Sequence, residues 1–186
     1  MRALLLTALT TALLTAAAAA PAADYVAQPE SKLGFTATYQ DEAFQGTFAR
    51  FTPVIRFDPA DLASSRFDVR IALASAGTAN AERDEMLLGS EFFDAAGAPE
   101  ARYVATRFRA LGGNRFVAEG TLSLRGVNKP VPLTFTWTPG ARPVLAGEAS
   151  VSRLAFNVGT GDWTDTELLP DAVKVTTRLV LAAKAQ

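Results

Sequence analysis

The sequence predicts an all-β fold: an antiparallel barrel of about eight strands, with one short helix capping an end. Three observations lead to this prediction. Apolar and polar residues alternate with a period of two in many short segments, and residues that favour tight turns separate those segments. Only one short segment carries the signals of a helix.

Five segments show the alternation that is typical of a strand with one buried face. In the first, apolar side chains occupy every second position from Leu33 to Tyr39. The same pattern covers residues 32–39, 66–73, 116–125, 131–138 and 173–181. Three glycines fall inside expected strands, where they either mark bends or thin the wall of the barrel: Gly34, Gly46 and Gly120.

The connecting segments favour hairpins. Residues 112–114, Gly-Gly-Asn, tolerate a positive φ and can join a strand that ends near Ala110 to one that starts at Arg115. Two further turns are expected at residues 126–130 and 139–143, which contain Gly and Pro. Successive hairpins give an antiparallel meander, and closing the meander into a barrel removes its exposed edges.

Residues 79–88 interrupt the strand pattern and predict the helix. Asn80 can cap its N-terminus, acidic residues follow in the first turn, and Gly89 can end it. We expect this helix to lie over one end of the barrel.

The first 22 residues predict a secretory signal peptide. Arg2 gives a positive start, residues 3–20 carry no charge, and Ala20-Pro21-Ala22 supplies the small residues of a cleavage site. We therefore expect cleavage near Ala22, export to the periplasm, and one domain over residues 23–186 with no membrane span. The alternative, a retained membrane anchor, is disfavoured because the segment is mostly Ala and Thr.

The composition excludes several function classes. The whole chain has a formal charge of −1, and removing the signal takes away Arg2, which leaves −2. A weakly acidic domain has no basic surface to hold a nucleic acid. The chain has no His and no Cys, so it lacks the usual general base, the common nucleophile pairs and most transition-metal ligands. We expect no enzyme activity, no catalytic residue, no metal and no cofactor.

Two acidic clusters, residues 82–85 and 162–167, are candidates for a catalytic or calcium-binding site. They could supply a carboxylate pair for hydrolysis, but nothing in the sequence selects a pair, and neither matches the spacing of a calcium loop. Solvated loops account for both.

Four segments resemble signatures of the YceI-like family. Residues 82–94 contain Arg-Asp, then Leu, then Phe-Phe-Asp, and residues 99–108 continue with Tyr103 opening the next strand. Residues 120–133 resemble a Gly-x-Leu…Gly-Val…Lys-Pro hairpin, and residues 153–159 resemble a late Arg-x-x-Phe-x-Val-Gly strand. The four segments occur in the family's order and span roughly residues 24–184, nearly the whole mature chain.

The resemblance implies an extended, lipocalin-like antiparallel barrel, usually periplasmic, that binds polyisoprenoid chains or similar long lipids. It implies no established catalytic residues. Family members often carry His near the second strand or in the helix after the Arg-Asp pair. This chain has Tyr39-Gln40 and Glu85-Met86 there, so any contact of an imidazole with a lipid head group is missing.

Alternation and family position together predict the residues that line the lipid site. They are Phe35, Phe48, Phe67, Val69, Ile71, Phe116, Leu122, Leu133, Phe135, Phe156, Val175 and Leu179. Arg83 and Arg153 are candidates for a polar or phosphorylated head group, because guanidinium groups match such anions; the alternative is an internal salt bridge. Trp163 either closes the mouth of the site or packs on it.

The leading hypothesis is therefore a protein that binds, and transports or stores, a long apolar lipid: a polyisoprenoid, an isoprenoid quinone or a fatty-acid derivative. A second hypothesis is a barrel filled by its own side chains that acts as a structural or interaction module. A carboxylate-dependent hydrolase ranks third. The sequence leaves a homodimer open.

Overall fold

The computed structural model describes residues 24–184, so the expected signal peptide lies outside the described residues. The described chain forms one antiparallel sheet of eleven strands, closed by pairing of β1 with β11. The strands are β1 (Asp24–Ala27), β2 (Lys32–Tyr39), β3 (Glu42–Phe48), β4 (Phe51–Arg56), β5 (Arg66–Ala72), β6 (Ala76–Gly77), β7 (Glu100–Gly112), β8 (Arg115–Leu124), β9 (Val127–Thr138), β10 (Val144–Ser152) and β11 (Ala172–Ala183).

Eight strands close the ring, in the order β1-β4-β5-β7-β8-β9-β10-β11, and β2, β3 and β6 extend it beyond β11. β1 pairs with the last residues of β11, while β2 pairs with the middle of the same strand. Short breaks therefore divide what would be three long strands into β1 and β2, β3 and β4, and β5 and β6. The prediction of a closed antiparallel barrel of about eight strands is confirmed.

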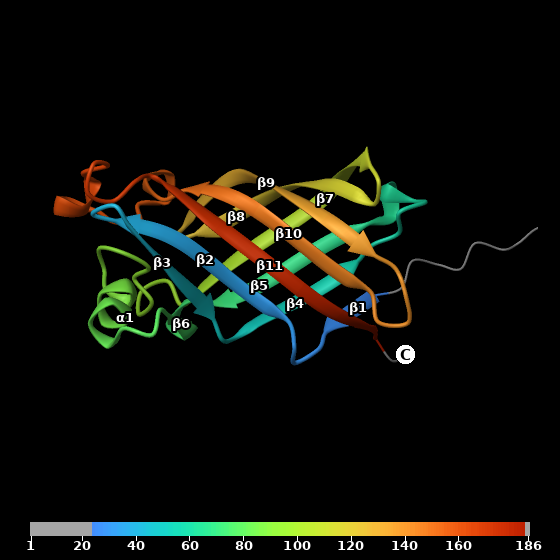
Figure 1. Cartoon of the computed structure of the whole chain (residues 1–186), viewed down its shortest axis with the longest axis horizontal. Helices are drawn as coiled ribbons and strands as arrows, with labels where there is room; N and C mark the ends of the chain where they lie inside the picture. Colours follow the sequence, from blue (N-terminus) through green and yellow to red (C-terminus); the bar gives the residue numbers. More distant parts are fainter. Residues whose placement is uncertain (1–23, 185–186) are drawn as a thin grey trace, which may run out of the picture.

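The predicted helix is also confirmed as α1 (Ala81–Leu88), with the Asn80 side chain accepting a hydrogen bond from the backbone N–H of Arg83 at 2.9 Å. Figure 1 shows α1 beside β6 at one end of the barrel, opposite the end that holds β1 and the C-terminus. We call these the helix end and the terminal end. Within residues 24–184, no helix combines the length and apolar character needed to cross a membrane.

One predicted turn is shorter than expected. Only Arg125 and Gly126, both with positive φ, separate β8 from β9, so residues 127–130 belong to a strand. Pro130 fits there because β9 pairs with β10 only from Thr134 onward, which leaves the N-terminal part of β9 paired on one side. Proline lacks a donor and is tolerated at such an edge.

The structure corrects the prediction of a strand at residues 153–159. Residues 153–159 form a turn of 3₁₀-helix, Leu154–Phe156, which ends at Asn157 in the left-handed conformation. Two further short 3₁₀-helices, Leu62–Ser64 and Leu73–Ser75, flank β5, and a fourth, Gly161–Thr164, lies in the segment before β11. Figure 1 shows that this last segment and α1 lie at the same end of the barrel.

Candidate functional site

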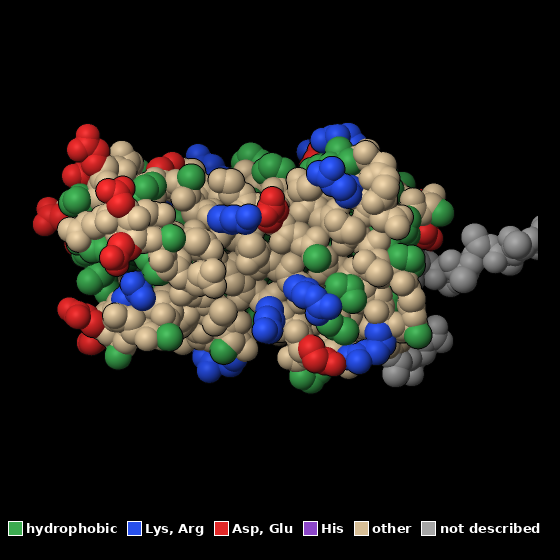
Figure 2. Space-filling view, viewed as in Figure 1, with side chains coloured by type: hydrophobic (Ala, Val, Ile, Leu, Met, Phe, Trp, Pro, Cys, Tyr) green, Lys and Arg blue, Asp and Glu red, His purple; other side chains and the backbone are tan. Residues whose placement is uncertain are grey.

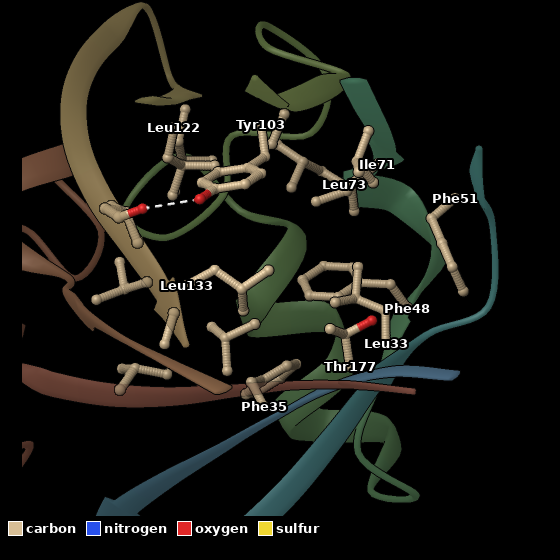
Figure 3. Close-up of a pocket in the computed structure, with 18 of the residues that line it drawn as sticks. Leu33, Phe35, Phe48, Phe51, Ile71, Leu73, Tyr103, Leu122, Leu133 and Thr177 are labelled. Atoms are coloured by element: carbon tan, nitrogen blue, oxygen red, sulfur yellow. Dashed lines mark hydrogen bonds between the residues drawn. The ribbon is translucent and has the colours of Figure 1, made fainter. Parts of the chain in front are cut away.

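The barrel encloses a cavity of about 200 Å³. All but three of its lining side chains are wholly apolar, and the exceptions are Tyr103, Arg153 and Thr177. Figure 3 shows side chains from several strands, among them Phe35, Leu122 and Leu133, pointing toward this common space. Inward-facing residues such as Val175 are only half-buried, because the interior is not filled by side chains.

Tyr103 lies across the inner wall, with its ring over the backbone of Gly120. A Cβ atom added to Gly120 would lie 2.2 Å from the Tyr103 hydroxyl, so only glycine leaves room for this ring. The hydroxyl donates to the carbonyl oxygens of Val131 at 3.0 Å and Ala118 at 3.2 Å, so it presents little polarity to the cavity. Burial raises the pKa of Tyr103 well above its ordinary value.

A cluster of aromatic rings closes the terminal end. Phe57 lies at its centre, with its ring centroid 5.0 Å from those of Phe116 and Trp137 and 5.1 Å from that of Phe135. Phe67 and Phe108 complete the cluster at 6.0 and 5.8 Å from Phe57. We call these six residues the aromatic plug. Phe57, Phe67, Phe116, Phe135 and Trp137 are each at most 5% exposed, so the plug is a packed floor for the cavity.

At the helix end, a thinner layer of side chains than the aromatic plug closes the cavity. Four side chains line both the cavity and a second space of about 300 Å³ outside it: Phe44, Leu87, Phe92 and Leu169. We call these four residues the partition and the outer space the vestibule. Because each of the four touches both spaces, the partition is one side chain thick at these positions.

Nine of the twelve predicted lining residues surround the cavity: Phe35, Phe48, Phe67, Val69, Ile71, Leu122, Leu133, Val175 and Leu179. The other three lie elsewhere, which corrects the expectation. Phe116 and Phe135 pack face to face in the aromatic plug, with ring centroids 5.6 Å apart. Phe156 is buried in the core at the helix end and does not reach the cavity. Alternation identifies which side chains point inward. It does not show whether an inward side chain lines the cavity or packs against another ring.

The structure also corrects the predicted role of Arg153 as a head-group ligand, because this side chain is buried. It is 4% exposed. Its Nη1 donates to the carbonyl oxygens of Val158 at 3.0 Å and Gly159 at 3.1 Å, its Nε donates to Pro170, and its Nη2 donates to Leu169. Desolvation lowers the pKa of Arg153 from its ordinary value. The guanidinium ties together the segment before β11, so its donors face the backbone and not a ligand.

Arg83 and Trp163 both line the vestibule. The Arg83 guanidinium lies 4.3 Å from the centroid of the Phe44 ring, and its Nε donates to the Thr78 hydroxyl at 2.9 Å. Thr78 in turn donates to Asp84 at 2.6 Å, so Arg83 is linked to an acid through Thr78 and not by the direct salt bridge that was the alternative to a head-group contact. The indole N–H of Trp163 donates to the Glu91 carboxylate at 3.1 Å.

The sequence did not single out the partition or Phe57. Leu87 and Phe92 fall in the Arg-Asp…Phe-Phe-Asp segment, which was the available signal for the partition. The acidic residues 162–167 lie on an exposed loop, where the Asp165 carboxylate accepts a bond from the backbone N–H of Glu167 at 2.8 Å. Among residues 24–184, no three Asp or Glu side chains gather closely enough to hold a metal ion.

Comparison with known proteins gives consistent matches. The family model for the YceI-like domain matches residues 25–181. A UPF0312 protein of Pseudomonas savastanoi is 36% identical over 134 residues, which cover 70% of this chain and 69% of that protein. The crystal structure of BcnA from Burkholderia cenocepacia superposes with a TM-score of 0.79 at 30% identity, covering 83% of this chain and 97% of that one.

A more distant structure, described as a polyisoprenoid binding domain from Saccharophagus degradans, has a TM-score of 0.67. It is 16% identical and covers 88% of this chain and 99% of its own, a likeness that concerns the fold alone.

Proposed function

Because the chain belongs to the YceI-like family, we propose that it binds a long apolar lipid by enclosing the hydrocarbon tail inside its barrel. The observation that carries the proposal is the apolar cavity between the aromatic plug and the partition. Water finds few hydrogen-bond partners in such a space, whereas a hydrocarbon tail loses no hydrogen bond on entering it.

Polyisoprenoids are the first ligand class, with isoprenoid quinones and fatty-acid derivatives as the other members. The description of the Saccharophagus degradans domain supports this order. Burial of each CH₂ group contributes about 0.8 kcal/mol, so the tail provides most of the affinity. The protein would carry or store this lipid in the periplasm, without a catalytic step.

The size of the cavity sets a condition on this function. At about 200 Å³ it is smaller than a typical ligand pocket, which holds roughly 300–1,000 Å³. A long tail therefore requires lining side chains to change rotamer or the partition to open into the vestibule. The filled-barrel alternative requires no such change and predicts that no ligand enters.

Native mass spectrometry of the purified mature protein tests the proposal. We expect a discrete adduct that organic extraction removes and identifies as an apolar lipid. The control is the same protein after unfolding, extraction and refolding, to which an added polyisoprenoid should bind again. Bare protein that also fails to bind added polyisoprenoid and fatty acid would refute lipid binding and favour the filled barrel.

A further inference from the structure

Charge is distributed unevenly over the barrel. Three segments at the helix end, residues 39–44, 80–92 and 160–169, hold nine acidic residues and one basic residue, a formal charge of −8. Residues 24–184 as a whole carry −2, so the rest of the described chain carries +6. Figure 2 shows the acidic side chains gathered at the helix end and basic ones over the body of the barrel. The small net charge therefore conceals a basic surface that the sequence did not indicate.

One row of cross-strand partners concentrates the positive charge on the outer wall. The row crosses five neighbouring strands, β8, β9, β10, β11 and β2, and consists of Arg115, Thr136, Ala146, Arg178 and Lys32. All five residues are exposed, whereas a chain neighbour of each is buried inside the barrel. Arg109 of β7, also exposed, lies in the next row opposite Val117 of β8. We call Lys32, Arg109, Arg115 and Arg178 the basic band.

The cations of the basic band are free of acidic partners. Within residues 24–184, none of the four forms an ion pair. The acids around the band have cations of their own: Glu30 pairs with Arg142 at 2.7 Å, Glu148 with Lys174 at 2.6 Å and Glu119 with Arg107 at 3.3 Å. The band therefore keeps its four positive charges for an external anion.

Two of these cations are placed at a cost to the sheet. Lys32 and Arg178 are direct partners across β2 and β11, and like charges in this position destabilise a sheet. Anions that lie over both side chains would remove the repulsion. This placement favours a role for the band outside the folded chain.

The surface between the cations suits a layer of lipid head groups. Thr136 and Ala146, which separate Arg115 from Arg178, have small side chains, whereas protein interfaces depend on large anchors such as Trp and Tyr. Leu111 lies two residues beyond Arg109, near the tip of the β7–β8 hairpin, and is 41% exposed. An apolar side chain beside a basic cluster is typical of a surface that enters the head-group region.

We propose that the basic band docks the side of the barrel onto an anionic membrane surface. Such a surface repels the acidic helix end, so contact is made through the wall formed by β8 to β11 and β2. Figure 1 shows β11 crossing the near side of the barrel between β10 and β2. This docking goes beyond the binding of a lipid tail, and each can hold without the other.

Sedimentation with lipid vesicles tests the docking. We expect the protein to bind vesicles made of equal parts of phosphatidylglycerol and phosphatidylcholine, and to remain free with phosphatidylcholine alone. Binding should be lost at about 1 M salt, where the Debye length falls to about 3 Å. Equal binding to the two kinds of vesicle, or binding that salt does not weaken, would overturn an electrostatic contact.

Charge removal identifies the surface that binds. Each basic residue near an anionic membrane contributes roughly fivefold in affinity, so the Arg115→Gln, Arg178→Gln double variant should bind the mixed vesicles at least about tenfold more weakly. The Arg66→Gln, Arg70→Gln double variant is the matched control. It removes the same charge from exposed positions of β5, on the opposite wall of the ring, and should bind as the parent does. Equal losses in the two variants would show that net charge, and not the band, governs binding.

A fluorescent label reports which wall meets the membrane. The chain has no Cys, so Thr136→Cys and Thr52→Cys each give one labelling site, at exposed positions on opposite walls. We expect the emission of an environment-sensitive label to shift to the blue on mixed vesicles at position 136 and to stay unchanged at position 52. Equal shifts, or a larger shift at position 52, would overturn the orientation. If the parent protein binds no vesicle, membrane docking is refuted while tail binding stands, and an acidic protein becomes the alternative partner.

Discussion

The ring of Phe35 lies over the backbone of Gly46, its cross-strand partner between β2 and β3. A Cβ atom at position 46 would lie 2.2 Å from the ring's Cζ atom. The missing side chain lets the ring lie along the wall and leaves the interior open. Tyr103 of β7 likewise lies over Gly120 of β8, although these two residues are diagonal neighbours and not direct partners. Two glycines that look like weak points in strands therefore create space for the cavity.

Replacing Gly46 with Ala should push the Phe35 ring into the cavity. We expect a loss of about 1–3 kcal/mol in the free energy of unfolding, as for other overpacked cores, and weaker binding of a long lipid. Chemical denaturation and a lipid titration measure the two effects. The Gly46→Ala, Phe35→Leu double variant should recover part of both, because Leu is smaller than the ring. A double variant as unstable as the sum of the single changes would show that the two residues are not coupled.

Tyr103 gives the protein a pH dependence in alkali. Its pKa in the folded state is raised above the ordinary value of 10.0, so the unfolded chain loses this proton first. Stability from this group is complete below pH 10 and falls as the pH rises above it, by up to about 1.4 kcal/mol per pH unit. Denaturation of the parent and of Tyr103→Phe at several pH values should show the parent's advantage shrinking above pH 10. A constant difference across this range would contradict the assignment.

The aromatic plug should carry a large share of the stability. Phe57→Ala removes the ring around which the other five pack, and such truncations cost about 3–5 kcal/mol. Leu111→Ala at the same end is the control, because Leu111 is 41% exposed; it should change the free energy of unfolding by less than about 0.5 kcal/mol. Similar losses in the two variants would show that the plug is not a packed unit.

Much of the fold follows from alternation. The segments expected at residues 32–39, 66–73 and 173–181 became β2, β5 and β11, because each faces the interior at every second position. The alternation did not predict β4. It is only six residues long and contains Pro53, which usually argues against a strand. It forms because closure of the barrel brings β1 and β5 to its two sides.

The site could be predicted only in part. Period two identifies inward residues, and it found Val69 and Ile71 on the cavity wall. It could not separate them from Phe135, because filling of the interior depends on Phe57, which follows β4 and lies outside the strand pattern. Arg153 looked like an anion ligand because a sequence does not show that backbone carbonyls occupy its donors.

Arg153 should stabilise the segment before β11 through its hydrogen bonds to backbone carbonyl oxygens. A lysine cannot reach the separate carbonyl oxygens that the guanidinium contacts. Arg153→Lys should therefore lower the free energy of unfolding by about 2–3 kcal/mol and speed amide hydrogen exchange over residues 158–170. Arg178→Lys, at an exposed position of β11, is the matched control. If Arg153 instead held a head group, the variant would lose lipid affinity with unchanged exchange.

Neighbouring positions on β11 separate the cavity from the outer surface. Val175 lines the cavity, and Thr176 faces solvent on the same strand. Val175→Asp should lower the affinity for a long apolar lipid at least about tenfold, because a carboxylate among apolar side chains must either lose its hydration or draw water into the tail's path. Thr176→Asp introduces the same charge one residue away and should bind as the parent does. Lipid titration by native mass spectrometry measures both, with circular dichroism to check folding. Equal binding by two folded variants would mean that the tail does not occupy the barrel.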